Sequence, residues 1–534
     1  MTVSEFSGTG ALIRLILRRD RLLLPIWIAL PPLFVILVAA AFVQLYPTAA
    51  SQQMVATQLA NSPGFVALLG PVSDPTIGGL TVWRSGIFAA LVVAGGSALT
   101  VIRHTRSDEE TGRYELLGSG AVGRRAPLAA SLVVTLGTDV LIGALVAGGL
   151  IAFGLPVTGS VAFGLSLAAI GWMFAALAGF VAQLTESAGV AKAIVAALFV
   201  LFYLFRAVGD GNEPSGGSWV SWMSPIGWMH LVKPFANERW GVFVLFLGAV
   251  IVLTAMAYAL SSRRDVGAGV LRPRLGPATA SPRLRSPLAL AWRLHRRTLL
   301  AWAAMFAVFG VTIGYLAKAS VDLLAANAQL AHLYALFGGA SAYTDALFTF
   351  SLTFAGWIAA AYAVTVTLRL QSEEVEGRVD HVLATPVSRL RWATSDLIIV
   401  VIGSVVVLAA FGLSAGLTYG LSSGNVGYEL PRMLVATLAY LPAVWVVAGI
   451  AMAFYGIIPR FALLSWGVLG AFIGLEIVGE TLQMSQSILD LSPFHRVPAV
   501  LVSGVSVTPL VSLTLVALVL TIAGLFGFQR RSIG

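Results

Sequence analysis

The sequence contains no cysteine and only three lysines among its 534 residues. Without cysteine the chain forms no disulfide and carries out no thiol chemistry. A Walker-type phosphate-binding loop ends in Gly-Lys-Ser or Gly-Lys-Thr, but Ala or Pro follows each of Lys192, Lys233 and Lys318. The chain therefore lacks a Walker site for ATP hydrolysis. We expect no catalytic residue, and no metal or cofactor bound by this chain, so the sequence does not predict an enzyme.

Charge is scarce as well, at 11% of residues against 58% hydrophobic residues and a mean hydropathy of +0.89. So many apolar side chains do not fit in one water-soluble core. Apolar runs of about twenty residues, long enough to cross a ~30 Å hydrocarbon layer as helix, recur six times in each half. We expect an all-α polytopic membrane protein with twelve spans at 22–46, 78–102, 128–154, 160–184, 190–208, 241–261, 298–317, 345–368, 393–420, 433–457, 461–479 and 509–528.

The basic residues predict the orientation, because Lys and Arg beside span ends stay in the cytoplasm. With the N-terminus inside, 26 of the 33 basic residues fall on cytoplasmic segments. The exceptions are Arg84, Arg206, Lys233, Arg239, Lys318, Arg432 and Arg496. We therefore expect a protein of the plasma membrane with both termini in the cytoplasm. The net charge of +9 favours contact with anionic lipid rather than nucleic acid, because the basic residues flank the spans.

Two charged segments repeat one another and organise the chain. We call residues 103–127 the first elbow and residues 369–392 the second elbow; each follows the second apolar run of its half. At an offset of 265 they share Ser107/Ser372, Glu109/Glu374, Gly112/Gly377, Arg113/Arg378, Val122/Val387 and Arg124/Arg389. Chance would give about one match in eighteen positions. The sequence thus predicts two parallel six-span units, 1–262 and 288–534. The Pro, Gly and Arg content of residues 263–287 predicts a cytoplasmic linker without packed structure.

Each elbow begins with acidic residues and continues with an apolar pair and arginines, an order that suits a short helix with its dipole complemented. Gly112 and Gly377 would permit a bend or a close backbone approach. Such a helix can pass a push from a docked protein into the spans, and a solvated charged loop is the alternative. The residues predicted to contact this partner are Asp108, Glu109, Glu110, Gly112, Arg113, Arg124, Glu373, Glu374, Glu376, Gly377, Arg378 and Arg389.

Two further features are duplicated. Residues 11–21 place arginines on one helical face and leucines on another. They form either a helix along the membrane surface or only a positively charged stop before the first span, and a counterpart at 288–297 favours the helix. After the fifth span of each half, an outer segment carries a Ser-Pro pair, Ser224-Pro225 or Ser492-Pro493. Proline and bordering aromatics predict short interfacial or re-entrant helices there.

Three ionisable residues lie within or near the predicted spans, where an uncompensated charge costs ~2.5 to 3.5 kcal/mol. Arg206 and Glu476 fall at nearly equivalent heights on the repeated fifth spans. We hypothesise that they pair across the midline as an outer gate; structural pairing without gating is the alternative. Asp139 lies near the middle of the third span. It would either bind a proton or a cationic substrate, or accept a hydrogen bond from a neighbouring Ser or Thr.

These motifs resemble the type-2 ATP-binding-cassette exporter permeases, whose six-span unit carries E-x-x-G, an apolar pair and P-V-S-R between its second and third spans. Glu374, Gly377 and 386–389 match this pattern, and Glu109, Gly112 and Arg124 match it in the first half. There 120–123, Gly-Ala-Val-Gly, replaces T-P-V-S, so the first copy is expected to dock less tightly. A fused pair of units is similar to the actinobacterial tetronasin or polyketide-antibiotic exporter permeases.

The resemblance implies the membrane subunit of an ATP-driven exporter of hydrophobic or amphipathic small molecules, including antibiotics and other drugs. Two copies of a separate cytoplasmic ATPase, which bind ATP and Mg, would hold the elbows as coupling helices. In this family the second and fifth spans line the substrate path. Lipid-facing or packed positions are the alternative for each lining candidate: Phe88, Phe202, Phe205, Phe350, Phe354, Trp466 and Phe472.

Two other functions are weighed against this one. A proton-coupled twelve-span drug antiporter needs no ATPase, and Asp139 and Glu476 would suit proton coupling, but the acidic elbows suit docking better. A membrane-embedded transferase requires converging acid, base or metal groups. The outer carboxylates are scattered along the chain instead, which disfavours an enzyme of this kind.

Overall fold

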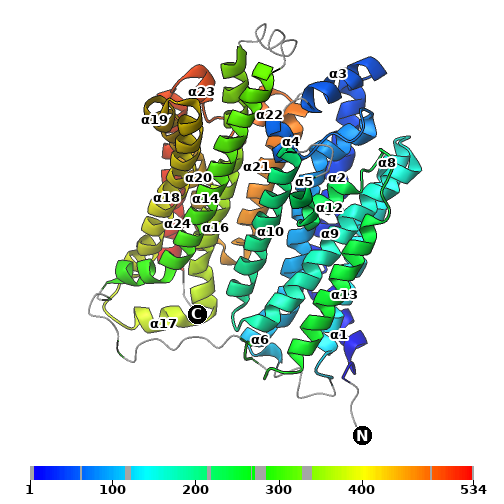
Figure 1. Ribbon diagram of the computed structural model, residues 1–534. Coiled ribbons are helices and arrows are strands. Elements are labelled where there is room, and N and C mark those ends of the chain that lie inside the picture. The colour runs from blue at the N-terminus through cyan, green and yellow to red at the C-terminus, as the bar shows by residue number, and fades with distance from the viewer. Residues whose placement is uncertain are drawn as a thin grey trace. The chain divides into compact units, whose positions relative to one another are not determined.

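The computed structural model describes residues 5–60, 63–114, 122–212, 218–265, 267–270, 279, 284, 286–326, 339–481 and 484–531. Over these residues every regular element is a helix (Figure 1). The chain divides into two compact units, unit 1 at Met1–Gly276 and unit 2 at Pro277–Gly534. The boundary falls inside the segment 263–287 that the sequence predicts to be the linker.

Eleven helices within these ranges are long and apolar enough to cross a membrane. They span Leu23–Leu45, Ile77–Glu110, Ala126–Ala152, Val157–Leu184, Ala188–Gly211, Val242–Ser261, Pro287–Lys318, Thr344–Val375, Arg389–Ser423, Val426–Ile457 and Val507–Arg530. Each coincides with one of the twelve predicted spans. The remaining prediction, 461–479, falls on a shorter apolar helix, Leu464–Gly479.

Unit 1 is built from six long helices with short helices between them. In chain order the elements are α1 (Thr9–Arg19), α2 (Leu23–Leu45), α3 (Ala49–Ala60), α4 (Pro63–Leu69), α5 (Ile77–Ile102), a π-helix (Arg103–Ser107), α6 (Asp108–Glu110), α8 (Ala126–Ala152), α9 (Val157–Leu184), α10 (Ala188–Asn212), α11 (Trp219–Trp222), α12 (Pro225–Leu231) and α13 (Val242–Ser261). Helix α9 is the most buried of the candidate spans and packs against α5, α8 and α13.

Unit 2 has a similar order of helices, and its first three long helices are longer than those of unit 1. Its elements are α14 (Pro287–Ala326), α16 (Gly339–Val375), α17 (Arg378–Leu383), α18 (Arg389–Ser423), α19 (Val426–Leu438), α20 (Leu441–Ile457), a 3₁₀ turn (Pro459–Phe461), α21 (Leu464–Thr481), α22 (Gln486–Leu489), α23 (Val500–Ser503) and α24 (Val507–Arg530). Here α14 packs against α18, and α20 packs against α24.

Glycine brings some of these helices into near-backbone contact. A Cβ at Gly143 would lie 2.5 Å from the carbonyl oxygen of Gly164, so α8 and α9 approach closely only because both positions lack a side chain. In unit 2, Gly456 and Gly524 bring α20 and α24 together in the same way. Glycine thus lets these helices pack closely on their inner faces, while large apolar side chains lie on their outer faces.

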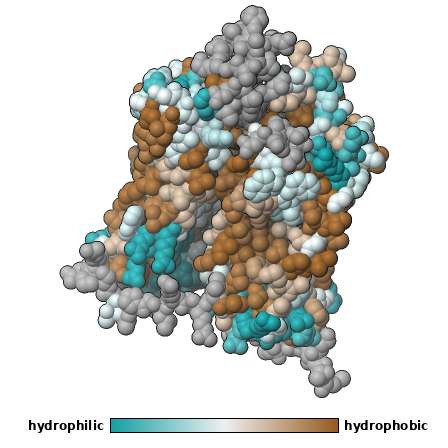
Figure 2. Space-filling model, viewed as in Figure 1, coloured by the Kyte–Doolittle hydropathy of each residue, from teal (hydrophilic) through white to brown (hydrophobic). Residues whose placement is uncertain are grey.

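Exposed apolar side chains cover the outer faces of the long helices. Ile26, Val244 and Val519 are each at least 60% exposed. On the face that Figure 2 shows, hydrophobic residues cover the middle of the helices and hydrophilic residues gather towards their ends. Such a surface is stable in a hydrocarbon layer. The chain is a multi-pass membrane protein.

The two predicted surface helices differ from one another. In unit 1, α1 ends at Arg19 and α2 begins at Leu23, so a separate amphipathic helix is present. In unit 2, the predicted counterpart 288–297 is the first part of the continuous helix α14. Pro25 in the first turn of α2 favours a helix start there, whereas 288–310 contains no proline.

Candidate functional site

Each elbow follows the second long helix of its unit. The first elbow continues α5 through the π-helix into α6, and the second begins in the last turns of α16. Figure 1 shows α6 at the same end of unit 1 as the N-terminus, and α17 at the same end of unit 2 as the C-terminus. Each elbow therefore lies at one end of its unit, the end at which a chain terminus is found.

The motif glycines adopt the same left-handed backbone conformation in both elbows. Their φ angles are 70° at Gly112 and 68° at Gly377. Gly112 N donates to the carbonyl of Glu109 (3.1 Å), and Gly377 N donates to that of Glu374 (3.0 Å). A residue with positive φ ends a helix, and glycine adopts this conformation without steric cost. The repeat in sequence is thus also a repeat in backbone geometry.

This geometry corrects the predicted position of the acidic residues. We expected them at the start of a short helix, but Glu373 and Glu374 lie in the last turn of α16, before Gly377 ends it. The short helix α17 begins only afterwards, at Arg378, with Asp380 in its first turn. In the first elbow, residues 115–121 lie outside the described ranges, so the corresponding short helix is not described.

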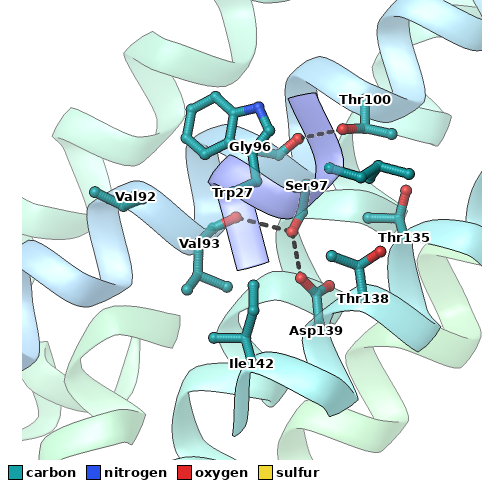
Figure 3. Close-up of a pocket in the computed structure, with 11 residues that line it drawn as sticks. Trp27, Val92, Val93, Gly96, Ser97, Thr100, Thr135, Thr138, Asp139 and Ile142 are labelled. Carbon is teal, nitrogen blue, oxygen red and sulfur yellow. Dashed lines mark hydrogen bonds between the residues drawn. The ribbon is translucent and has the colours of Figure 1, made fainter. Parts of the chain in front are cut away.

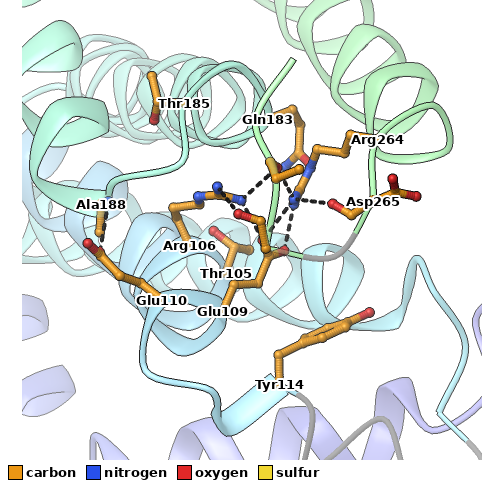
Figure 4. A network of polar contacts seen from close by, with 12 residues as sticks. Thr105, Arg106, Glu109, Glu110, Tyr114, Gln183, Thr185, Ala188, Arg264 and Asp265 are labelled. Atoms are coloured by element: carbon orange, nitrogen blue, oxygen red, sulfur yellow. Dashed lines mark hydrogen bonds and ion pairs between the residues drawn. The ribbon is translucent and has the colours of Figure 1, made fainter. Parts of the chain in front are cut away.

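In unit 1 the motif glutamate binds an arginine that follows the sixth span (Figure 4). Arg264 forms two hydrogen bonds with the carboxylate of Glu109, at 2.5 and 2.8 Å. Its Nε donates to the side chain of Gln183 at the end of α9 (2.8 Å). The buried Arg106 donates to Glu109 as well (2.5 Å). Bidentate charged pairs of this kind are strong and fix orientation.

Unit 2 contains the equivalent arrangement. Arg531, directly after α24, forms an ion pair with Glu374. The hydroxyl of Tyr455, near the end of α20, donates to the same carboxylate (2.7 Å). The guanidinium of Arg531 lies over the Tyr455 ring, 4.9 Å from its centroid. Each motif glutamate therefore joins the ends of the fourth and sixth long helices of its own unit.

The far end of each elbow reaches the same arginine. Arg124 donates to the backbone carbonyl of Arg264, and Arg389 donates to that of Arg531 (2.7 Å). We call these two sets, Glu109–Arg264–Arg124 and Glu374–Arg531–Arg389, the clamps. Their members are related by offsets of 265 and 267. Both ends of each elbow are thus attached to the segment that follows the sixth span.

The predicted docking residues therefore fall into two groups. Clamp glutamates face inward, since the side chains of Glu109 and Glu374 are 9% and 16% exposed. Arg113 and Arg378 are half exposed, and they pair with Asp108 (3.5 Å) and Glu373 (2.7 Å) respectively. Arg113 and Arg378 are available to a partner, and so are the other exposed residues of the predicted set, Glu110, Arg124 and Glu376.

Two more acidic residues of the elbows have defined places. Glu110 Oε2 accepts a hydrogen bond from the backbone N–H of Ala188, at the start of α10 (3.0 Å). Glu376 is exposed and pairs with Arg378. Through Glu110, the first elbow also contacts the fifth long helix of unit 1.

The turn between α1 and α2 is attached to the first elbow. Asp20 binds His104 Nε2 (2.5 Å) and Arg103 (3.0 Å). Arg19 binds Asp108 at 2.7 Å. Burial acts to raise the pKa of the Asp20 carboxyl, but the hydrogen bond and charge of His104, with the neighbouring arginines, outweigh it and lower that pKa. The surface helix α1 is therefore joined to the elbow through charged groups.

Part of the predicted linker is packed, which corrects the expectation that 263–287 lacks packed structure. The buried Arg106 donates to the carbonyls of Gly267 (2.9 Å) and Ala268 (3.1 Å). Val270 N donates to the carbonyl of Gln183 (3.1 Å). Arginine side chains can satisfy several backbone carbonyls at once, so a segment rich in Gly and Arg is held against unit 1. Residues 271–278 lie outside the described ranges.

Arg206 is fully buried near the end of α10 opposite the elbow. It donates to the carbonyls of Ala67 (2.6 Å) and Leu68 (3.0 Å) at the end of α4, and lies 3.7 Å from Asp210. Asp210 also accepts a hydrogen bond from His230 (3.1 Å). Burial lowers the pKa of His230 despite the charge of Asp210. The charge of Arg206 is therefore compensated inside unit 1.

In unit 2, Glu476 pairs with His495 at 3.7 Å. Glu476 is 266 residues after Asp210, and His495 is 265 residues after His230. An acid on the fifth long helix and a histidine beyond the Ser-Pro pair are thus duplicated in the two units. Asp210, rather than Arg206, is the counterpart of Glu476. The gate between Arg206 and Glu476 joins different units and stays a prediction.

Asp139 lies on α8 and is 1% exposed. Ser97 on α5 donates to its Oδ1 (2.7 Å), and its Oδ2 has no hydrogen-bond partner among the described residues. The carboxyl group lines a pocket between α2, α5 and α8 (Figure 3). The hydrogen bond from a neighbouring serine is the second of the two roles that the sequence suggests, but it satisfies only one oxygen.

The predicted path-lining aromatics are mostly half-buried within their own units. Phe88 contacts Phe34, Phe202 contacts Phe174, and Phe350 and Phe354 contact each other. Phe205 and Phe472 are also half-buried, while Trp466 is 41% exposed. Within each unit the second and fifth long helices are in contact. The role of these side chains in a substrate path stays a prediction.

Sequence reasoning missed the residues that complete the clamps and the Asp210–His230 pair. Arg264 and Arg531 stand at nearly the offset of the elbows, so extending the repeat comparison past the sixth span would have found them. Gln183 and Tyr455 differ in type, and only the fold brings them to equivalent places. Among the described residues, no group of three His, Asp or Glu side chains could hold a metal ion.

The fold and these sites define an all-helical, multi-pass membrane protein with a duplicated polar elbow. A family model described as the multidrug efflux system permease Rv1217c, C-terminal domain, matches residues 284–529. The chain is 39% identical over 532 residues to the multidrug efflux system permease protein Rv1217c of Mycobacterium tuberculosis (strain ATCC 25618 / H37Rv), covering 99% of this chain and 96% of that protein. The chain belongs to the family of this permease.

Proposed function

We propose that this chain is the membrane subunit of an ATP-driven exporter that moves hydrophobic or amphipathic small molecules, including drugs, out of the cell. The relative is named a multidrug efflux system permease, and a multi-pass helical protein suits that role. Two copies of a separate ATPase would bind the two elbows from the cytoplasm and supply ATP and Mg. The proposed orientation, with both termini and both elbows in the cytoplasm of a plasma-membrane protein, follows from the distribution of Lys and Arg.

The duplicated clamp supports this proposal most. A solvated loop has no need to bind, at both of its ends, the residue that follows the sixth span. A coupling element needs such contacts, because a displacement of the elbow must be transmitted to several helices at once. Charged, bidentate contacts are stiff and directional. A force on the exposed part of an elbow would therefore move the ends of the fourth and sixth long helices together with the second.

The exposed residues of the elbows suit a protein partner. In the first elbow Arg113 is exposed, and in the second Glu376, Arg378 and Asp380 are exposed and of both signs. Val375, directly before Glu376, is 79% exposed. An exposed large apolar residue rimmed by charges is typical of a contact site between proteins. The two elbows differ in these exposed residues, so they would bind the two ATPase copies with different affinities.

The proposal is tested by extracting the tagged chain gently from its own host and measuring what copurifies and what powers efflux. We expect an ATPase with Walker motifs at two copies per chain, and efflux that stops when ATP is depleted but continues when the proton gradient is collapsed. A chain recovered alone, with efflux intact and independent of ATP, would contradict the proposal.

A proton-coupled antiporter is the second candidate, and the buried carboxyl of Asp139 is the observation that favours it. A carboxyl group inside a span is typical of proton relays. Efflux that stops when the proton gradient is collapsed at constant ATP would support this candidate and contradict the first.

A further inference from the structure

The pocket that contains Asp139 offers almost only hydrogen-bond acceptors. Besides the carboxyl group it is lined by the hydroxyls of Ser97, Thr100, Thr135 and Thr138. The three threonines donate their protons to backbone carbonyls one turn earlier on their own helices, at 2.7 to 2.8 Å. A hydroxyl has one proton and two lone pairs. These groups therefore present lone pairs to the pocket, and Ser97 already donates to Asp139 or to its own helix.

The carboxylate has no counter-charge in its surroundings. Among the described residues no charged group acts on it, and its Oδ2 has no hydrogen-bond partner. Gly171 on α9 faces the carboxyl group, and a side chain there would overlap it. A buried charge that is neither paired nor fully hydrogen-bonded is unfavourable. Such a group is stable either when it is protonated or when a positively charged hydrogen-bond donor lies beside it. The unpartnered Oδ2 leaves a place for such a donor.

The rest of the lining is apolar and aromatic. Leu24, Val92, Val93 and Ile142 supply aliphatic walls, and Trp27 lies against Gly96, where a Cβ would be 3.0 Å from its ring. Trp27 and Thr138 are only half-buried, so the pocket is bounded on one side by groups near the surface of the helices (Figure 3). The cavity volume is about 10 Å³, room for one group the size of a water molecule. An ammonium group fits this space, and the apolar body of such a ligand would lie outside it, against the half-buried Trp27.

Unit 2 shows that the fold does not need this acid. At the offset of the elbows, Ser404 stands in place of Asp139 and Tyr362 in place of Ser97. Tyr362 is fully buried against Gly403, and the indole N–H of Trp445 donates to Ser404 (2.9 Å). The equivalent place is thus filled by a tyrosine ring and a neutral hydroxyl. The equivalent helices α16 and α18 pack there without a carboxyl group.

We propose that the pocket formed by α2, α5 and α8 binds the ammonium group of an amphipathic amine, with Asp139 as its counter-charge. The N–H donors of the ammonium group meet Asp139 Oδ2 and the threonine hydroxyls, and Trp27 contributes cation–π and apolar contact. This inference names a cationic class of cargo for the proposed exporter and therefore rests on the proposed function. An uncharged analogue of the same shape lacks the charge that the pocket requires.

Binding to the full-length chain in lipid nanodiscs tests the proposal, with no ATPase or nucleotide present. The probes are dansylcadaverine, which carries a primary ammonium group, and its neutral N-acetyl derivative; dansyl fluorescence reports their affinities. Asp139→Ser introduces the residue found at the equivalent position of unit 2. It should lower the affinity for the ammonium probe at least tenfold and change the affinity for the neutral probe less than twofold. Val140→Ala, on the exposed face of the same helix, should change neither. Equal affinity of wild type and Asp139→Ser for the ammonium probe would overturn the proposal.

A measurement on the unmodified chain covers the case in which Asp139→Ser does not fold. Dicyclohexylcarbodiimide labels carboxyl groups in apolar surroundings, and mass spectrometry of the digested chain reports labelling at Asp139. Dansylcadaverine should slow this labelling at least fivefold, and the N-acetyl derivative should not. Labelling that neither probe slows would show a site for a proton alone and contradict the proposal. Because no ATPase is present in this assay, its result is independent of the energy source. A failure to bind the amine would contradict this inference without contradicting ATP-driven efflux, and amine binding could be observed even if efflux were not driven by ATP.

Discussion

In unit 1 the carboxylate of Glu109 meets Arg264, and in unit 2 that of Glu374 meets Arg531. In each elbow the glycine three residues after this glutamate, Gly112 or Gly377, has the same left-handed backbone conformation. Inside the membrane the units differ, since a carboxyl group in one stands where a serine stands in the other. The elbows of the two copies thus share their attachment to the sixth span, whereas their interiors have diverged. The comparison separates the elbow contacts that both halves share from the interior residues that distinguish one half from the other.

Removing the arginine of each clamp should produce the largest difference in stability between the two units. Among the described residues, Arg531→Met leaves Glu374 with the Tyr455 hydroxyl as its hydrogen-bond donor. Removing one partner of a buried ion pair costs about 3 kcal/mol. Arg264→Met should cost less, about 1 to 2 kcal/mol, because Glu109 keeps Arg106. Thermal unfolding of the full chain in micelles, followed by tryptophan fluorescence, should rank Arg531→Met as the less stable variant.

A double variant provides the control for this prediction. Glu374→Gln combined with Arg531→Met removes both charges, so no carboxylate is left unpaired and part of the stability should return. If Arg264→Met were as damaging as Arg531→Met, or the double variant no better than the single one, the two clamps would not work as described.

The motif glycines should respond equally in the two units. Alanine at φ near 70° costs about 1 to 2 kcal/mol because of its Cβ. A Cβ at Gly112 would meet no atom within 4 Å, and one at Gly377 only an ordinary contact at 3.9 Å. Gly112→Ala and Gly377→Ala should therefore lower the melting temperature by similar amounts, and the asparagine variants by less. A loss in one unit only would show that the elbows differ in backbone geometry.

The smallest expected effect concerns Asp20, which has no counterpart in the continuous helix α14. Its pKa is lowered in the folded chain, so its stabilising contribution is present above its unfolded pKa and is lost as pH falls through the folded value, below 3.8. Asp20→Asn should lower stability by under about 1 kcal/mol at pH 6. The gap to wild type should close towards pH 3.

Melting curves of both proteins between pH 3 and 6 check this prediction. Asp265→Asn serves as the control, because this exposed side chain lies in the same region and should have no measurable effect. A gap that stayed constant down to pH 3 would show that the charge of Asp20 does not hold the α1–α2 turn.

The sequence alone predicts much of the helical framework, because span length and hydropathy follow from the thickness of the membrane. Eleven of the predicted spans coincide with apolar helices. The elbows were found because a repeated charge pattern survives in two copies. The local structure of the second elbow was predicted wrongly: its acids were expected to open a helix, but Glu373 and Glu374 lie at the end of α16, which Gly377 ends with a positive φ. Composition and charge order do not reveal that backbone conformation.

Partners distant in sequence were the least predictable part of the site. Arg264 lies 155 residues after Glu109, and nothing local to either residue indicates the other. Arg206 was assigned to Glu476 by its height along the span, whereas Asp210, one helical turn away, supplies its nearest acid within unit 1. Tertiary packing decides such pairings, and it also places Gln183 and Tyr455, which share no residue type, in equivalent positions.

Crosslinking tests most directly whether a separate motor protein grips the elbows. Because the chain has no cysteine, a single cysteine at the exposed position Thr111 or Ala384 can carry a short photoactivated crosslinker, with exposed Ser503 on α23 as the control position. In membranes of the native host, both elbow positions should crosslink to the same cytoplasmic ATPase, and Ser503 should not. If neither elbow position crosslinks to any ATPase while the labelled chain still supports efflux, the central claim is contradicted.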